Sequence, residues 1–187
     1  MICDPIDKDR INLFALVSYI PGALGEFLDL LREELVTGCK PHAHVTILPP
    51  RPVTGDIQTN SRTIEDRLDG FGPFQVDLTG VQIFEKSNVI YAALDQGWAK
   101  LVAMHAALDV EGLRFKENFS YHPHVTLAQE LDPVAVPEFL ELAKRRWQES
   151  PPQRSFPVDT LTFVQNTGGN SWIDLAEFDL AAVRVRR

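Results

Sequence analysis

The stretch PHAHVTILPP, residues 41–50, is similar in sequence to YHPHVTLAQE, residues 121–130. Both contain His-Val-Thr followed by an aliphatic residue. Alternate residues of a β-strand point to the same face, so His44 and Thr46 share one face of the first strand. The valine and the aliphatic residue point the opposite way and are predicted to enter a core. The second copy, around His124, repeats this alternation.

The elements before each copy also repeat. Residues 11–20 and 89–94 are rich in β-branched and aromatic residues, which is typical of buried strands. Apolar residues at helical spacing follow each strand, beginning at Leu24 in the first unit and at Trp98 in the second. Strand, helix and motif strand thus occur twice in nearly the same register, which indicates an internal duplication.

The rest of the chain predicts further helices and strands. Asp132 and Pro133 have the residue types of a helix N-cap and first turn, and Gly168-Gly169 is typical of a tight turn between strands. The expected helices are 59–68 and 136–147, and the expected strands are 74–84, 156–164 and 172–180. We predict an α+β fold in which residues 1–187 form a single bilobal domain, an internal duplication with two sheets backed by helices around a central cleft.

Composition and charge narrow the class of protein. The chain has 187 residues, of which 44% are hydrophobic and 24% charged, which is typical of a globular protein with a core. It has 18 Lys and Arg against 26 Asp and Glu, giving a net charge of -8. Proteins that grip long nucleic acids through phosphates are usually basic. A nucleotide or an RNA end is therefore the expected partner, and duplex DNA is not.

Cysteine content and hydropathy indicate the compartment. Cys3 and Cys39 form neither a disulfide framework nor a Cys-x-x-Cys zinc pair. The N-terminal segment is polar, and no apolar run approaches the roughly 18–20 residues of a membrane span. We expect a soluble cytoplasmic monomer that does not bind membranes.

Two imidazoles and two hydroxyls facing one cleft suit the chemistry of a phosphodiester. Cleavage of a P–O bond needs a base for the attacking oxygen and an acid for the departing one, and histidine serves either role near neutral pH. His44 and His124 provide such a pair. The Thr46 and Thr126 hydroxyls can donate hydrogen bonds to the non-bridging phosphate oxygens.

The duplicated His-x-Thr-aliphatic motif resembles that of the two-histidine (2H) phosphoesterase superfamily, and most nearly its bacterial 2′-5′ RNA ligases and cyclic-phosphodiesterase relatives. This resemblance implies hydrolysis of 2′,3′-cyclic phosphates, or hydrolysis and reversible formation of 2′-5′ linkages. It implies no metal and no cofactor. It makes His44 and His124 the catalytic pair and Thr46 and Thr126 the phosphate-binding residues. It leaves open which histidine is the acid.

One position departs from the family pattern. Members often have an arginine shortly after the second motif, where this chain has Gln129. A basic group that assists the phosphate must then come from elsewhere, and the candidates are Arg51, Lys40 and Lys86. Phe84 and Tyr121 are the candidate surfaces for stacking of a nucleobase.

Two other classes of protein stay open. His42 and His122 complete two His-x-His pairs, so His42, His44, His122 and His124 together are the candidate ligands of a metal-dependent hydrolase. That hypothesis lacks a nearby carboxylate and gives the threonines no role. The third class is a non-catalytic nucleotide- or RNA-binding module, against which the two intact motifs argue. His105 lies on the apolar face of its helix and is expected to be a packed structural residue.

Overall fold

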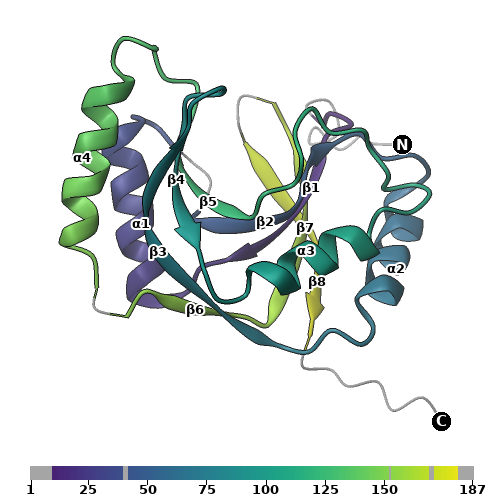
Figure 1. The fold of residues 1–187 in the computed structure, drawn as a ribbon. Helices are drawn as coiled ribbons and strands as arrows, with labels where there is room; N and C mark the ends of the chain where they lie inside the picture. Colours follow the sequence, from purple (N-terminus) through teal and green to yellow (C-terminus); the bar gives the residue numbers. More distant parts are fainter. Residues whose placement is uncertain (1–9, 40–41, 152, 169–170, 181–187) are drawn as a thin grey trace, which may run out of the picture.

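Two four-stranded antiparallel sheets form the centre of the protein, in a computed structural model that describes residues 10–39, 42–151, 153–168 and 171–180 (Figure 1). The first sheet has the strand order β2-β1-β7-β8 and the second has β5-β4-β3-β6. The strands are β1 (Phe14–Tyr19), β2 (His44–Arg51), β3 (Phe74–Phe84), β4 (Val89–Leu94), β5 (His124–Ala128), β6 (Ser155–Val158), β7 (Thr160–Asn166) and β8 (Trp172–Asp179). This architecture confirms the predicted α+β fold with two sheets.

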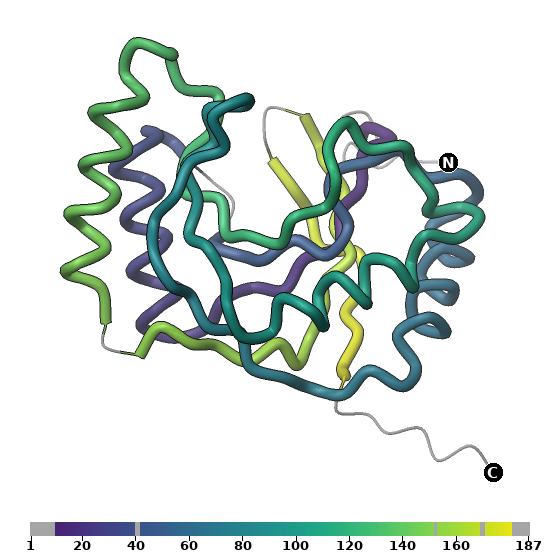
Figure 2. Tube along the Cα trace, in the orientation of Figure 1, coloured from purple at the N-terminus to yellow at the C-terminus, as the bar shows by residue number. Residues whose placement is uncertain are grey.

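The two sequence units exchange strands. The third strand of the first unit, β3, leaves its own sheet and pairs with β4 of the second unit. In return β7, from the second unit, pairs with β1, so that segments far apart in the sequence lie side by side (Figure 2). The single strand expected over 156–164 is therefore wrong. It is interrupted at Asp159, and its halves, β6 and β7, belong to different sheets.

The helices are exchanged in the same way. Helices α1 (Gly22–Leu35) and α4 (Val136–Gln148) pack together on one flank, against β5 and β3 of the second sheet (Figure 1). Helices α2 (Ile57–Leu68) and α3 (Trp98–Ala107) lie on the opposite flank, where α3 contacts β2. Each sheet is thus covered by one helix from each unit.

The motif strands alternate as the sequence predicts. Val45, Ile47 and Val125 are fully buried, and Leu127 is almost fully buried.

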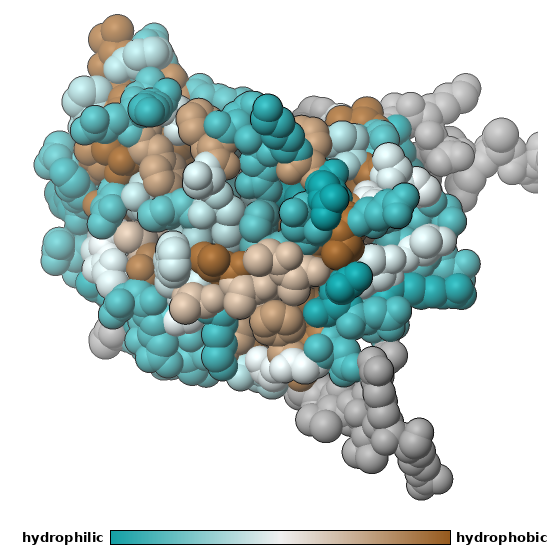
Figure 3. Space-filling model, turned by 45° about the vertical axis from the view of Figure 1, so that its right-hand side comes forward, coloured by the Kyte–Doolittle hydropathy of each residue, from teal (hydrophilic) through white to brown (hydrophobic). Residues whose placement is uncertain are grey.

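Hydrophilic side chains cover most of the face in Figure 3, with hydrophobic side chains gathered near its middle. Among the described helices, none combines the length and apolar character needed to cross a bilayer.

Local residue types act differently at three element ends. Asp56 caps α2 by accepting a hydrogen bond from the Thr59 N–H at 2.8 Å. Strand β2 does not stop at Pro49-Pro50 but continues to Arg51, because an edge strand tolerates residues without an N–H. Asp132 does not cap α4. Its carboxylate accepts from the Val134 N–H in a preceding turn, and the helix begins at Val136.

Gly25 marks the tightest approach between α1 and the end of β1. A Cβ atom built on Gly25 would overlap the backbone carbonyl of Ile20, which cannot rotate away as a side chain would. We expect Gly25→Ala to lower the free energy of unfolding by at least ~2 kcal/mol through this overpacking. Gly72→Ala is the matched control, since a Cβ there meets no atom within 4 Å. Urea unfolding of the two variants measures the difference, and equal stabilities would contradict the proposed close contact.

Candidate active site

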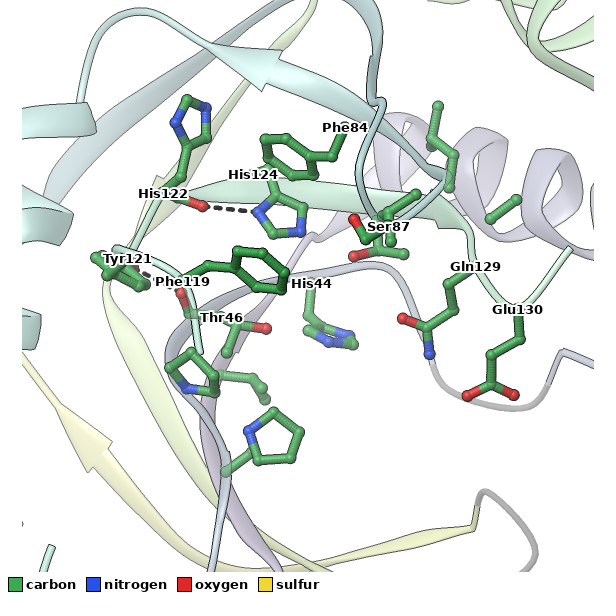
Figure 4. Close-up of a pocket in the computed structure, with 18 of the residues that line it drawn as sticks. His44, Thr46, Phe84, Ser87, Phe119, Tyr121, His122, His124, Gln129 and Glu130 are labelled. Atoms are coloured by element: carbon green, nitrogen blue, oxygen red, sulfur yellow. Dashed lines mark hydrogen bonds between the residues drawn. The ribbon is translucent and has the colours of Figure 1, made fainter. Parts of the chain in front are cut away.

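The two motif strands meet across the molecule. Strands β2 and β5 are edge strands of the two sheets and contact one another. Their polar faces open into a cavity of about 1360 Å³, lined by His44, Thr46, His124 and Thr126 together with residues from both sheets. Figure 4 shows His44 and His124 in this cavity, approaching it from different strands. The four residues expected to form one site are therefore brought together.

Each motif histidine is fixed by the carbonyl two residues before it. His44 Nδ1 lies 2.6 Å from the His42 oxygen, and His124 Nδ1 lies 2.7 Å from the His122 oxygen (Figure 4). A carbonyl can only accept, so Nδ1 of each ring carries the proton and donates it. Nε2 is then the nitrogen left to exchange protons with a bound molecule. The first histidine of each His-x-His pair, His42 or His122, therefore orients the second one through its backbone carbonyl.

Both imidazoles are held neutral near pH 7. Loss of water around the ring is the main cause that lowers the pKa of His44 to about 4, and the charges of Arg32 and His124 lower it further. The His42 carbonyl and the Asp29 carboxylate oppose this effect. Burial likewise lowers the pKa of His124, and the His122 carbonyl opposes that shift.

The threonine hydroxyls are available to a ligand. Thr46 and Thr126 line the cavity two residues beyond their histidines and are partly exposed. In the part of the chain that the structure describes, neither hydroxyl has a hydrogen-bond partner. The backbone of Thr46 is held by the Tyr121 hydroxyl, which donates to its carbonyl at 2.7 Å. A phosphate in the cavity would find both hydroxyls free to donate.

Phe84 and Tyr121 both line the cavity, as expected, but each has one ring face covered. Phe84 stacks on Tyr91, with ring centroids 4.0 Å apart, and meets the His124 ring edge-on. Tyr121 stacks on His105 at 3.9 Å. His105 also hydrogen-bonds the Ile47 carbonyl at 2.8 Å, which fits its expected structural role.

Arg51 does not fulfil the expectation that it assists the substrate. Its side chain is 3% exposed and lies outside the cavity lining. The guanidinium pairs with Glu117 and donates to the carbonyls of Pro49 and Leu113. It anchors the segment before β5 to the end of β2, because a buried charge needs such partners. Lys86 does line the cavity, from an exposed turn, whereas Lys40 falls outside the described residues.

Two cavity residues were missed in the sequence. Arg32 stands between the apolar positions of its helix in the sequence, yet it is buried and lines the cavity, as do Val36 and Cys39. Phe119 lines the cavity and is 63% exposed (Figure 4). Its signal in the sequence is an aromatic residue in a polar loop shortly before the second motif. Arg32 has no comparable signal, because the spacing of its helix is amphipathic throughout.

The four histidines do not form a metal-binding cluster. Within the described ranges, no group of three or more His, Cys, Asp and Glu side chains is placed to hold an ion. His42 instead turns its ring to Asp29, with Nδ1 2.9 Å from the carboxylate. The geometry of these donors argues against the four-histidine hypothesis.

Known proteins share this sequence pattern and fold. Residues 29–170 match the 2′-5′ RNA ligase superfamily, and the protein belongs to that family. This confirms the resemblance to 2H phosphoesterases. No curated protein matches the chain in sequence.

Solved structures agree in fold. The chain is similar to E. coli LigT in its apo form, with a TM-score of 0.64 and 14% identity over 90% of this chain and 97% of LigT. LigT complexed with 3′-AMP gives 0.61 and 14%, covering 90% and 98%. Kluyveromyces marxianus Usb1 gives 0.53 and 13%, covering 88% and 97%. At such identities the likeness establishes the fold.

The lowered pKa of His44 predicts a specific loss of stability in acid. The unfolded state takes up a proton near pH 6.5 and the folded state only near pH 4, so stability falls as pH drops between these values. Between pH 7.5 and 5, we expect wild type to lose about 2 kcal/mol more than His44→Gln. Urea unfolding at the two pH values measures this. His42→Gln, at an exposed ring, is the control and should follow wild type; a parallel fall in His44→Gln would contradict the prediction.

Proposed function

We propose that the protein is a metal-independent phosphoesterase that hydrolyses 2′,3′-cyclic phosphates or 2′-5′ linkages of a nucleotide or RNA end. The observation that carries this proposal is the matched pair of motif histidines. Both line one cavity, and both are fixed through Nδ1 so that Nε2 is left for proton transfer. A free hydroxyl lies two residues beyond each ring. Family membership supports the same chemistry.

Hydrolysis of a cyclic phosphate follows from this arrangement. A water oxygen attacks phosphorus while Nε2 of one neutral histidine accepts its proton. The bond from phosphorus to the 2′ or 3′ oxygen breaks, and Nε2–H of the other, protonated histidine supplies the proton to that oxygen. The Thr46 and Thr126 hydroxyls donate to the non-bridging oxygens, on which negative charge concentrates. The product is a phosphate monoester, and the two histidines have exchanged protonation states.

The surroundings of the two rings favour one assignment of roles. The base must be neutral, and the pKa of His44 is lowered to about 4 with Arg32 as a nearby cation. The acid must hold a proton, which an anionic phosphate helps it to retain. His124 has no such cation among the causes that shift its pKa, apart from His122 when protonated. His44 is therefore the proposed base, and His124 the proposed acid, for hydrolysis.

The size and lining of the cavity support a nucleotide at an RNA end. Its volume of about 1360 Å³ exceeds the roughly 300–1,000 Å³ typical of small-molecule sites. Phe119 offers an exposed ring in this cavity, whereas Phe84 and Tyr121 each have a face already covered. A base stacked on an aromatic ring gains about 1–3 kcal/mol irrespective of its identity. Phe119 is thus the proposed base platform.

Substitution of either motif histidine tests the mechanism. We expect His44→Gln and His124→Gln to lower kcat for 2′,3′-cyclic AMP by roughly 10²–10⁴-fold, the usual contribution of proton transfer. Turnover of wild type should persist in EDTA, and its pH profile should be bell-shaped because one ring must be neutral and the other protonated. A nucleoside phosphodiester with a p-nitrophenol leaving group needs no acid, so it should restore turnover to His124→Gln alone.

His122→Gln provides the matched control. The His122 carbonyl orients His124, but its ring hydrogen-bonds no described residue, so turnover should stay within about tenfold of wild type. A collapse of activity in this variant, together with inhibition of wild type by EDTA, would instead support the four-histidine metal site. Near-normal turnover by His44→Gln would refute the acid–base pair.

Phe119→Ala tests the base platform. Loss of stacking should raise KM for 2′,3′-cyclic AMP about 5- to 100-fold and leave kcat nearly unchanged. Ribose 2′,3′-cyclic phosphate, which has no base, is the control substrate and should be hydrolysed equally by wild type and variant. An equal rise of KM for both substrates would show that Phe119 shapes the cavity in general and does not bind the base.

A further inference from the structure

Arg32 is a buried cation without an acidic partner. It lies in the last turn of α1 and is buried, with a relative exposure of 6%. Among the described residues, its guanidinium donates two hydrogen bonds, to the His42 carbonyl at 3.2 Å and to the Cys39 sulfur at 3.4 Å. Its Nε is buried and has no hydrogen-bond partner in the described part of the chain. Among the described residues, no carboxylate forms an ion pair with it.

Such an arrangement is unfavourable unless an anion completes it. A buried charge that lacks its partner strongly destabilises the folded state, because its lost hydration is not replaced. The C-terminal end of α1 compensates part of this charge. The comparison with Arg51 shows what full compensation looks like: that guanidinium is equally buried, but it binds Glu117 and two carbonyls. Arg32 has fewer partners than Arg51, and unlike Arg51 it lines the cavity.

The position of Arg32 points to the site of reaction. It lines the same cavity as His44, along the wall formed by Val36, Cys39 and His42. It donates to the carbonyl that also fixes His44 Nδ1. Its charge is close enough to act on His44 itself. Lys86 is the only other described cation in the lining, and it is exposed on the turn between β3 and β4.

We propose that Arg32 is the phosphate-binding cation of this cavity and pairs with the non-bridging oxygens of the substrate beside His44. The inference rests on the proposed function for the identity of that anion. A planar guanidinium with unused N–H groups suits two phosphate oxygens at once. The bound phosphate supplies the negative charge that the buried arginine lacks. In the free protein the charge of Arg32 adds to the effect of burial, which is the main cause of the lowered pKa of His44.

The opposite signs expected for two arginine substitutions test this role. Arg32→Met keeps the bulk of the side chain and removes an uncompensated charge, so stability should stay the same or rise. Its affinity for inorganic phosphate should fall about 10- to 100-fold. Arg51→Met removes the same charge at the same depth but takes away the cation that pairs with Glu117, so it should lose stability while its folded form still binds phosphate. Urea unfolding and titration followed by ³¹P NMR measure the two quantities.

Arg32→Lys provides a second test in case Arg32→Met does not fold. It keeps the charge but not the fork of donors, so its phosphate affinity should lie between those of wild type and Arg32→Met. Phosphate binding by Arg32→Met or Arg32→Lys as tight as that of wild type would overturn the proposal, as would a wild type that does not bind phosphate. Failure of the proposed function would look different: wild type would bind phosphate through Arg32 yet hydrolyse no cyclic nucleotide or 2′-5′ linkage.

Discussion

The exchange of strands between the two sequence units is the constraint on which the site depends. Because β7 pairs with β1 and β3 pairs with β4, each sheet is built from both units. The two sequence units cannot separate without breaking backbone hydrogen bonds inside a sheet. The edge strands β2 and β5 are therefore held in contact, and their histidines keep a fixed relation. Rigid placement of this kind is what a proton-transfer pair requires.

The two sequence units resemble one another, but the surroundings of their two motif histidines differ. The two units fix their histidines by the same contact, from Nδ1 to a carbonyl two residues earlier. What differs is the neighbourhood that the exchanged helices bring. Helix α1 places Asp29 and Arg32 behind His42 and His44, whereas His124 lies beside the Phe84 and Tyr91 rings. One ring thus borders charges and the other borders aromatic faces, which suits them to different roles in one reaction.

Local patterns in the sequence predicted most elements and the central residues of the site. The alternation around His44 and His124 predicted which side chains are buried and which face the cavity, because a strand has a period of two. The partner of each strand was not predictable, since pairing between β1 and β7 depends on residues far apart in the chain. The interruption at Asp159 was not predictable for the same reason. Strands β6 and β7 are both apolar, and they differ in the sheet to which they belong.

The errors at single residues have physical causes as well. Arg51 follows two prolines, which normally indicate a solvated loop, yet an edge strand accommodates them and carries Arg51 to Glu117. Arg32 stands among charged residues on an amphipathic helix, and only packing reveals that the loop after α1 covers it. The charge and spacing of residues predict which face of a helix is polar, but they do not predict whether another segment packs over that face.

The pairing of β1 with β7 also bears on when the protein can fold. Phe14 lies opposite Gln165, so β1 pairs with a strand that the ribosome makes much later. Until then the first sheet would consist of β1 and β2 alone, and a two-stranded ribbon is marginally stable in water. Contacts between distant residues also slow folding, because a long loop must close before they form. The nascent chain therefore holds its first histidine motif in an incomplete sheet, and the cavity can form only after β7 has been synthesised.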